Sequence, residues 1–289
     1  MEHDDYPALF KSADISSNKA QSSYLKLIKF EYGLLFLAAV IALSLRQEAV
    51  FLYVLALIAS SGLLIFMSIK KPEKDWYGCR ALAESIKTSS WRYMMRAEPF
   101  EDVPKLKEVN DKFREFLIEI LEVNKHLRDS IVKHPDGGDQ ISPEMIRIRG
   151  IELEERKSIY LRERIKEQRK WYINKAIFNK KQFSKWIIIC VVVQVTAIIL
   201  ALLRIKYGDI WAFWPTEPLL VLSAAIVGWI QIKKFNELAS AYSLTAHEIG
   251  IIESRISDII GEEDFSEFVN EAELAFSREH TQWIARQQD

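Results

Sequence analysis

The feature that most constrains this chain is a long run without a single charged residue, from Ala49 to Ile69. As a helix that rises ~1.5 Å per residue, this run is long enough to cross the ~30 Å hydrocarbon core of a lipid bilayer. A helix of a soluble bundle usually keeps a polar face toward water, which this run cannot provide. The run therefore predicts a membrane-spanning helix.

Three further apolar blocks bring the number of expected spans to four. The spans are expected at residues 30–45, 49–69, 186–203 and 215–232. Only Arg46, Gln47 and Glu48 separate the first two, which predicts a tight antiparallel hairpin. Before the fourth span, Trp211, Phe213 and Trp214 are typical of an interfacial aromatic belt. We expect an all-α membrane protein with four transmembrane helices, arranged as two hairpins with a cytoplasmic helical bundle or coiled-coil extension.

Lysines orient these spans. They flank the same end of each hairpin, whereas the two short outer connections carry fewer basic residues. The flanking lysines are Lys19, Lys26, Lys29, Lys70, Lys71, Lys74, Lys175, Lys180, Lys181, Lys185, Lys233 and Lys234. Because cytoplasmic loops carry the excess of Lys and Arg, we expect both termini and the middle segment in the cytoplasm. No removable signal peptide is expected before the first span.

The polar segments carry helical patterns of their own. Apolar residues alternate at steps of three and four from Leu106 to Leu127 and again from Phe235 to Ile259, as in helices that pack lengthwise on a partner. Residues 134–139 predict a loop, and Ser142 with Pro143 predicts a helix start. We expect that helix to run almost without a break into the third span.

A weak internal repeat predicts a duplication. Leu82-Ala83-Glu84-Ser85-Ile86 follows the second span, and Thr245-Ala246-His247-Glu248-Ile249 follows the fourth. Each segment emerges from a hairpin through a pair of lysines. We therefore expect a first module over residues 1–134, a linker over 135–141 and a second module over 142–289.

Several classes of function are excluded by what the sequence lacks. A net charge of -1 argues against nucleic acid as a partner. Cys79 and Cys190 are too few for a disulfide framework, and the five histidines have no metal-ligand spacing. His247-Glu248 resembles the start of a zinc-protease motif, but Ile251 stands where its second histidine is required. We expect no enzyme, no metal and no cofactor.

Small and polar residues inside the spans are candidates for lining a pore. No span carries a central charge, which argues against an ion-coupled transporter. The alternative interpretation is helix–helix packing, which also favours small residues. The pore-lining candidates are Ser60, Ser61, Gln194, Ala197, Ala201, Ala224, Gly228 and Gln231.

The second half resembles the SLATT domain, a bacterial module with two transmembrane helices. The resemblance covers roughly residues 160–286, and a divergent copy is indicated in the first half by Trp76-Tyr77, Arg80-Ala81-Leu82-Ala83-Glu84 and Trp91-Arg92-Tyr93. The matching stretches of the second half are Tyr160-Leu161-Arg162-Glu163-Arg164-Ile165, Gln168-Arg169-Lys170-Trp171-Tyr172, Lys175-Ala176 with Asn179, Phe235-Asn236-Glu237-Leu238-Ala239, Tyr242-Ser243-Leu244-Thr245-Ala246-His247-Glu248, Glu267-Phe268-Val269 and Ser277-Arg278-Glu279-His280-Thr281-Gln282-Trp283.

The resemblance implies a membrane effector of a prokaryotic conflict system, located in the bacterial inner membrane. Two hypotheses follow: a gated, ion-permeable pore used in anti-phage defence, or a scaffold or sensor that conducts nothing. A pore implies a homo-oligomer in the lipid bilayer, for which we expect a tetramer. The trigger is open between a nucleotide second messenger and a separate defence protein.

Motif residues that face the cytoplasmic bundle are the candidates for ligand binding or gating. Arginine with aromatic rings suits an anionic, planar ligand, while packing within the bundle is the competing interpretation. These candidates are Arg164, Arg169, Trp171, Tyr172, Tyr242 and His247.

Overall fold

The computed structural model describes residues 1–44, 47–102, 105–211 and 213–288, with 278–288 described by their backbone alone. Arg46 of the expected outer turn and Pro104 lie outside the described residues. The described part contains helices and no strand, which confirms the all-α class. It divides into two compact units. The polar unit comprises Met1–Ser22, Pro72–Tyr172 and Leu244–Asp289, and the apolar unit comprises Ser23–Lys71 and Ile173–Ser243.

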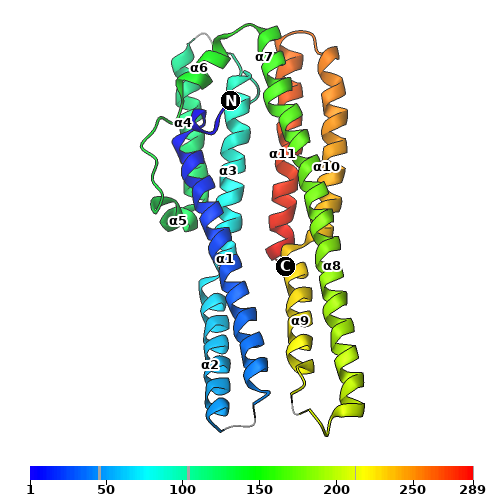
Figure 1. Ribbon diagram of the computed structural model, residues 1–289. Coiled ribbons are helices and arrows are strands. Elements are labelled where there is room, and N and C mark those ends of the chain that lie inside the picture. Colours follow the sequence, from blue (N-terminus) through cyan, green and yellow to red (C-terminus); the bar gives the residue numbers. More distant parts are fainter. Residues whose placement is uncertain (45–46, 103–104, 212, 289) are drawn as a thin grey trace. The chain divides into compact units, whose positions relative to one another are not determined.

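The apolar unit is built from the segments in which the spans are expected. It contains α2 (Gln47–Lys70), α9 (Thr216–Lys233) and the apolar parts of α1 (Ala8–Ile41) and α8 (Glu167–Tyr207). Within this unit, α1 runs antiparallel to α2, and α8 runs antiparallel to α9 (Figure 1).

Three helical stretches in the described residues are long and apolar enough to cross a membrane. They are Gln47–Met94, Leu153–Tyr207 and Thr216–Asp258. The helix α1 is not among them: Lys26, Lys29 and Glu31 interrupt its apolar stretch, and it ends at Ile41. The prediction of four membrane spans in two hairpins therefore stays a prediction.

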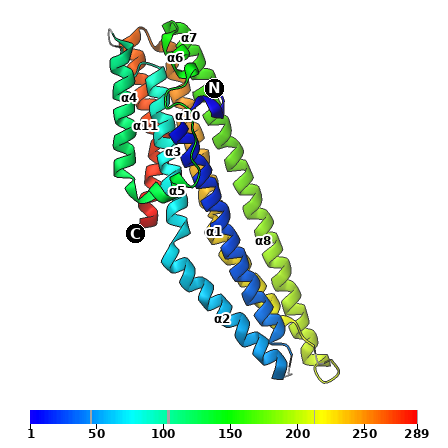
Figure 2. The ribbon, with the colours of Figure 1, turned by 90° about the vertical axis from the view of Figure 1, so that its left-hand side faces the viewer.

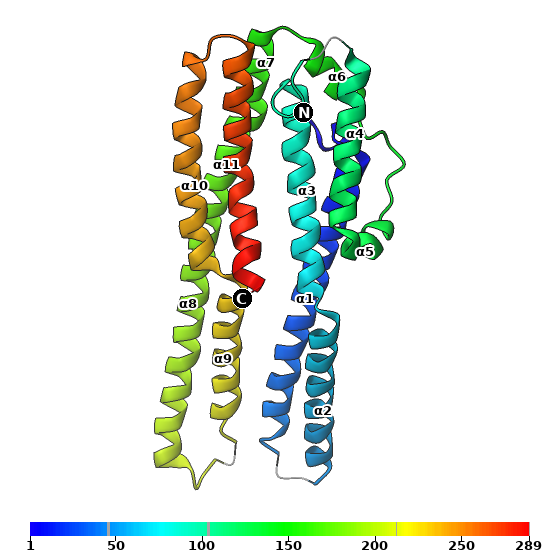
Figure 3. The ribbon, with the colours of Figure 1, turned by 180° about the vertical axis from the view of Figure 1, so that it is seen from behind.

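The polar unit is a helical bundle in which the two halves of the chain pack together. Its helices are α3 (Pro72–Met94), α4 (Leu106–Val123), α5 (Arg128–Val132), α6 (Pro143–Gly150), α7 (Leu153–Tyr160), most of α10 (Phe235–Arg255) and α11 (Glu262–Gln288), with the first part of α1. The last helix of the chain, α11, packs along α3 of the first half. Figures 2 and 3 show this pairing from two sides, with α11 between α3 and α10 in Figure 3.

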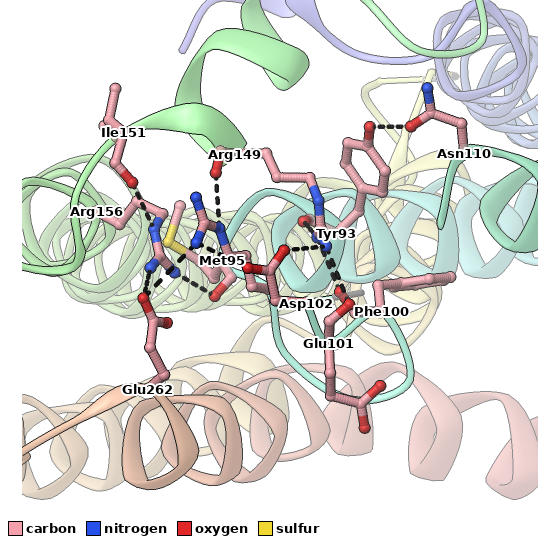
Figure 4. Close-up of polar contacts among 11 residues, drawn as sticks. Tyr93, Met95, Phe100, Glu101, Asp102, Asn110, Arg149, Ile151, Arg156 and Glu262 are labelled. Carbon is pink, nitrogen blue, oxygen red and sulfur yellow. Dashed lines mark hydrogen bonds and ion pairs between the residues drawn. The ribbon is translucent and has the colours of Figure 1, made fainter. Parts of the chain in front are cut away.

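Buried arginines bind the carbonyl groups at the C-terminal end of α3. Arg149 donates to the carbonyls of Tyr93 and Phe100 at 2.6 and 2.8 Å, and Arg156 donates to that of Met95 at 2.9 Å. Arg156 also pairs with Glu262 at the start of α11 (Figure 4). The last carbonyls of a helix have no partner within it and favour cations, so these arginines anchor the end of α3 to its neighbours.

The start of α6 follows the sequence prediction, but its length does not. Ser142 caps the helix, since its hydroxyl accepts from the amide of Met145 at 3.2 Å and Pro143 follows. However, α6 ends at Gly150, and the helix that runs into the third expected span begins only at Leu153. The helical path from Pro143 into the third expected span is thus interrupted at Ile151 and Glu152, which adopt extended backbone conformations.

The two predicted stripes differ in outcome. In the stripe from Phe235 to Ile259, every apolar position is buried or half-buried, as predicted. In the stripe from Leu106 to Leu127, Val109, Phe113 and Leu127 are buried, and Phe116 and Ile120 are half-buried. The prediction is wrong at Leu106 and Val123, which are exposed, while Leu117 is buried outside the predicted stripe.

Candidate functional site

Two polar pairs lie inside the apolar unit. On the first pair of helices, the hydroxyl of Ser60 donates to Oε1 of Glu31 at 2.5 Å. On the second pair, Nε2 of Gln194 donates to the hydroxyl of Ser223 at 2.9 Å. In both cases 29 residues separate the partners. Each antiparallel helix pair thus contains a serine that is hydrogen-bonded to a second side chain. That side chain carries a carboxyl group in the first pair and a carboxamide group in the second.

The two pairs occupy corresponding positions in the two halves of the chain. The shift in numbering that brings Glu31 onto Gln194 also brings Ser60 onto Ser223 and Lys71 onto Lys234. These lysines are both left-handed, with φ of 45° at Lys71 and 46° at Lys234. A lysine rarely adopts this conformation, so its recurrence at matched positions is a backbone signature of the duplication.

A break at Lys234 separates α9, which contains the fourth expected span, from α10, which carries the stripe from Phe235. The positive φ of Lys234 interrupts the regular helix there. Lysine is an ordinary helix former, so no local pattern predicts this break.

Glu31 is a residue of the apolar unit that was not among the candidates singled out from the sequence. It stands at the start of its apolar block, yet its partner Ser60 lies near the middle of α2. Only 4% of Glu31 is exposed, and its Oε2 has no hydrogen-bond partner among the described residues. Burying a polar group without a partner is costly, so a carboxylate kept in this position needs a reason. The expectation that no span carries a central charge did not take account of Glu31, which lies at the start of the first expected span.

The pore-lining candidates divide between the interior and the surface of the apolar unit. Ser60 and Ala197 are buried, and Gly228 is half-buried. Gln194 is exposed, although it is hydrogen-bonded to the buried Ser223. The remaining candidates are exposed on the isolated chain: Ser61, Ala201, Ala224 and Gln231. Their role in a pore stays a prediction.

An apolar cavity of about 460 Å³ lies between α1, α2 and α9 of the apolar unit. Its wall includes Tyr32, Tyr53 and a group of alanines to which the candidate Ala224 belongs. Gly228 lies near it and lets α9 approach Tyr32 closely, because a Cβ there would come within 2.3 Å of the tyrosine hydroxyl. Small residues thus permit close packing of helices from the two halves.

The polar unit contains a fully buried ion pair. Nε and Nη2 of Arg164 donate to the two carboxylate oxygens of Glu273 at 2.8 and 2.6 Å, and Tyr160 donates to Oε1 at 3.0 Å. Arg164 lies in a π-helical turn, Leu161–Lys166, a feature often found at functional sites. The π turn directs Arg164 inward from the helix that continues as α8.

The pair and its surroundings shift several pKa values. Burial opposes the charge of Arg164, but Glu273 outweighs it and raises the arginine's pKa. Burial, reinforced by Glu273, raises the pKa of Tyr160 well above its ordinary value. Burial also raises the pKa of Tyr6, whose hydroxyl accepts from Trp91 Nε1 at 2.9 Å. The arginine is therefore charged and the two phenols are neutral at physiological pH.

The structure brings some of the ligand-binding candidates together. Arg164 and Trp171 line one cavity, and the ring of Tyr172 packs edge-on against that of Trp171 at 5.0 Å. Arg169 instead pairs with Glu253 at 2.8 Å. His247 is exposed on α10, and Tyr242 belongs to the apolar unit.

Glu273, the ion-pair partner of Arg164, was not among the residues singled out from the sequence. Glu273 is fully buried, as are Val269 and Ala272. One turn separates Glu273 from Val269, so its position on the apolar stripe of α11 is the signal that could have found it.

The cavity beside Arg164 has a volume of about 280 Å³ and a polar wall. Tyr6, Arg80, Lys87, Arg164 and Trp171 contribute to it from the N-terminal segment, α3 and the start of α8. No cluster of three or more potential metal ligands occurs in the described residues. The polar unit thus offers a cavity in which cationic side chains converge.

Comparison with family models assigns both halves of the chain. Residues 7–157 match the model described as SMODS and SLOG-associating 2TM effector domain 3. Residues 160–283 match SMODS and SLOG-associating 2TM effector domain 1. Neither a curated protein nor a solved structure matches the chain. The two models lie in tandem and together cover most of the sequence.

Proposed function

Because this chain belongs to the SLATT family, with two of its domains in tandem, we propose that it is an oligomeric membrane effector that forms a gated, ion-permeable pore. Its location would be the bacterial inner membrane, and its role anti-phage defence. The family description supports an effector built from modules with two transmembrane segments, and the apolar unit supplies two such pairs of helices.

In this proposal the apolar unit crosses the bilayer four times. The helices α2, α8 and α9 provide spans of sufficient length and hydropathy. The apolar part of α1 completes the set, with Lys29 near one surface, where a lysine can extend its amine toward water. The excess of lysines beside the spans supports a cytoplasmic location for both termini and the polar unit.

The observation that carries the pore is the recurrence of polar pairs in the apolar unit. Glu31–Ser60 and Gln194–Ser223 lie at corresponding positions of the two helix pairs. Polar side chains in spans usually face a bundle interior or an ion pathway. Four helices enclose little space, so the pathway requires several chains around an axis, and we propose a tetramer.

Ion flux from liposomes that contain the purified protein tests the pore. We expect discrete currents or flux from the wild type, altered in conductance or selectivity by Gln194→Leu, Gly228→Leu and Glu31→Gln. Thr196→Val is the matched control, since Thr196 is exposed on α8 and bonds only to its own helix.

Two outcomes would contradict the proposal. The absence of ion flux from liposomes that contain the wild-type protein, also after extract of infected bacteria is added as a trigger, would contradict the pore hypothesis. It would favour the scaffold or sensor. If the currents of Gln194→Leu and Glu31→Gln equal those of the wild type, the polar pairs do not line the ion pathway.

A further inference from the structure

The cavity in the polar unit contains hydrogen-bond donors that the protein itself does not use. Nη1 of Arg164 is buried and has no hydrogen-bond partner among the described residues, although Nε and Nη2 are bound to Glu273. Arg164 is only 2% exposed and belongs to the wall of the cavity. An unused donor on a buried, charged guanidinium is costly, which indicates that something binds it.

Lys87 adds a second unused donor to the same wall. In the described part of the chain its amine has no hydrogen bond or ion pair and lies only against the ring of Tyr6, at 5.8 Å from the centroid. Burial, with the charge of Arg164 nearby, lowers the pKa of Lys87. Two cations thus share one cavity.

Tyr6 supplies a third donor. Its hydroxyl already accepts from Trp91, so its own proton is the group left to donate, and no acceptor for it occurs among the described residues. Three donors of different chemistry, a guanidinium, an ammonium and a phenol, therefore converge from three segments of the chain.

The carboxylates around the cavity are largely engaged elsewhere. Glu84 pairs with Arg80 at 2.8 Å, and Glu163 accepts from Arg162 at 2.8 Å. Glu167 is exposed at the edge of the cavity. The buried end of the cavity therefore favours an anion. The carboxylates in the cavity wall restrict the size of that anion.

We propose that this cavity binds a small, water-soluble ligand through a phosphoryl group held by Arg164, Lys87 and Tyr6. A phosphoryl group has several acceptor oxygens, which match three convergent donors, two of them charged. A volume of about 280 Å³ leaves room for more than the phosphoryl group alone. The indole of Trp171 lines the same cavity, where a planar group of the ligand can lie against it.

Binding to the purified full-length chain in detergent tests the proposal directly and does not depend on whether the chain conducts ions. The probes are inorganic phosphate, adenosine monophosphate and glycerol 3-phosphate, each compared with chloride at equal ionic strength by calorimetry and by thermal unfolding. The three probes share the phosphoryl group and separate free phosphate, a nucleotide and a lipid headgroup as its source. We expect at least one to bind and to raise the melting temperature above that in chloride.

Variants that spare the Arg164–Glu273 pair identify the site. Lys87→Met keeps the aliphatic part of the side chain and should weaken binding at least about tenfold, as expected for the loss of one charge-assisted hydrogen bond. Tyr6→Phe should weaken it less, because a neutral donor is lost. Lys74→Met, on the same helix but exposed, should bind like the wild type. The proposal is overturned if no probe binds the wild type above chloride, or if Lys87→Met and Tyr6→Phe bind as the wild type does.

Discussion

Glu273 and Arg164 lie 109 positions apart in the sequence, yet they form two hydrogen bonds inside the polar unit. Such a pair stabilises the fold only while both charges are present, because either one alone is a buried charge without compensation. The face of the Arg164 guanidinium also lies over the ring of Phe276, at 5.1 Å from the centroid. At the scale of residues, this pair is the most sensitive point of the polar unit.

Glu273→Ala is expected to lower the free energy of unfolding by ~3–5 kcal/mol, because it leaves Arg164 charged and buried. Thermal and denaturant unfolding of the purified protein would measure this loss. Glu271→Ala is the control, since its ion pair with Arg255 is exposed and is worth less than ~1 kcal/mol. Equal losses of unfolding free energy in Glu273→Ala and Glu271→Ala would show that the buried ion pair stabilises the fold no more than the exposed one does.

Gly228→Ala is expected to destabilise the packing of α9 against α1 by ~1–3 kcal/mol, as overpacking does. The added Cβ would lie 2.3 Å from the hydroxyl and 3.1 Å from Cζ of Tyr32. Tyr32→Phe should recover part of the loss, because it removes the nearer atom. Gly62→Ala, whose Cβ meets nothing within 4 Å, should leave thermal unfolding in detergent unchanged or slightly improved. A Gly228→Ala variant as stable as Gly62→Ala would refute the close contact.

At the scale of elements, structural features that depend on neighbouring residues could be predicted from the sequence. Features that depend on contacts between distant residues could not. The N-cap at Ser142 and the stripe from Phe235 follow from local patterns and are confirmed. The π turn that carries Arg164 and the left-handed backbone of Lys234 have no local signal. Lys71 does have one, because Pro72 follows it and a proline disfavours helical conformation in the residue before it. The burial of Glu31 was missed because its partner Ser60 belongs to another helix.

The left-handed lysines make a paired prediction with adjacent controls. Lys71→Gly and Lys234→Gly should each raise the melting temperature or leave it unchanged, because glycine adopts positive φ without steric cost. Lys70→Gly and Lys233→Gly replace residues inside α2 and α9 and should cost ~1 kcal/mol each. Thermal unfolding in detergent compares the four variants. Equal losses within each pair would show that Lys71 and Lys234 are helical in solution.

The loop of residues 134–139 is expected to loosen in acid. The amide of Gly138, together with Lys11 of α1, lowers the pKa of Asp136. A carboxyl group whose pKa is lowered on folding stabilises the fold above its unfolded value, ~4, and this contribution is lost as the pH falls through the lowered pKa. The protection factors of the loop amides, measured by hydrogen exchange and corrected for the intrinsic effect of pH, should therefore fall below about pH 4. In Asp136→Asn the exchange should be faster at neutral pH and should respond less to acid; a loop with the same pH response in both proteins would contradict this.

At the scale of the whole molecule, the family domains and the folded units divide the chain differently. The first domain match ends at residue 157, yet α3 of the first half packs along α11 of the second. Met94 and Trp91 of α3 are fully buried in the polar unit. The two domains therefore complete one another, a relation that no local pattern could reveal.

Residues 1–157 expressed alone are expected to be unstable, because the face of α3 that α11 covers would meet water. Resistance to proteolysis would measure this, and co-expression of residues 158–289 as a separate chain should restore it. A fragment that resists proteolysis by itself as well as the full chain does would show that the halves fold independently.

The correspondence of Glu31 with Gln194 has a consequence for any assembly of this protein. Since each chain contributes one helix pair with a carboxyl group and one with a carboxamide, copies of the chain always bring the two kinds in equal number. A ring of identical single-domain subunits would carry the same side-chain group, carboxyl or carboxamide, in every helix pair. In a ring of the fused chain, half of the helix pairs carry the carboxyl group and half carry the carboxamide. In any assembly of this chain, the fusion of the two domains therefore sets the ratio of carboxyl to carboxamide groups in these polar pairs, and the number of subunits does not change it.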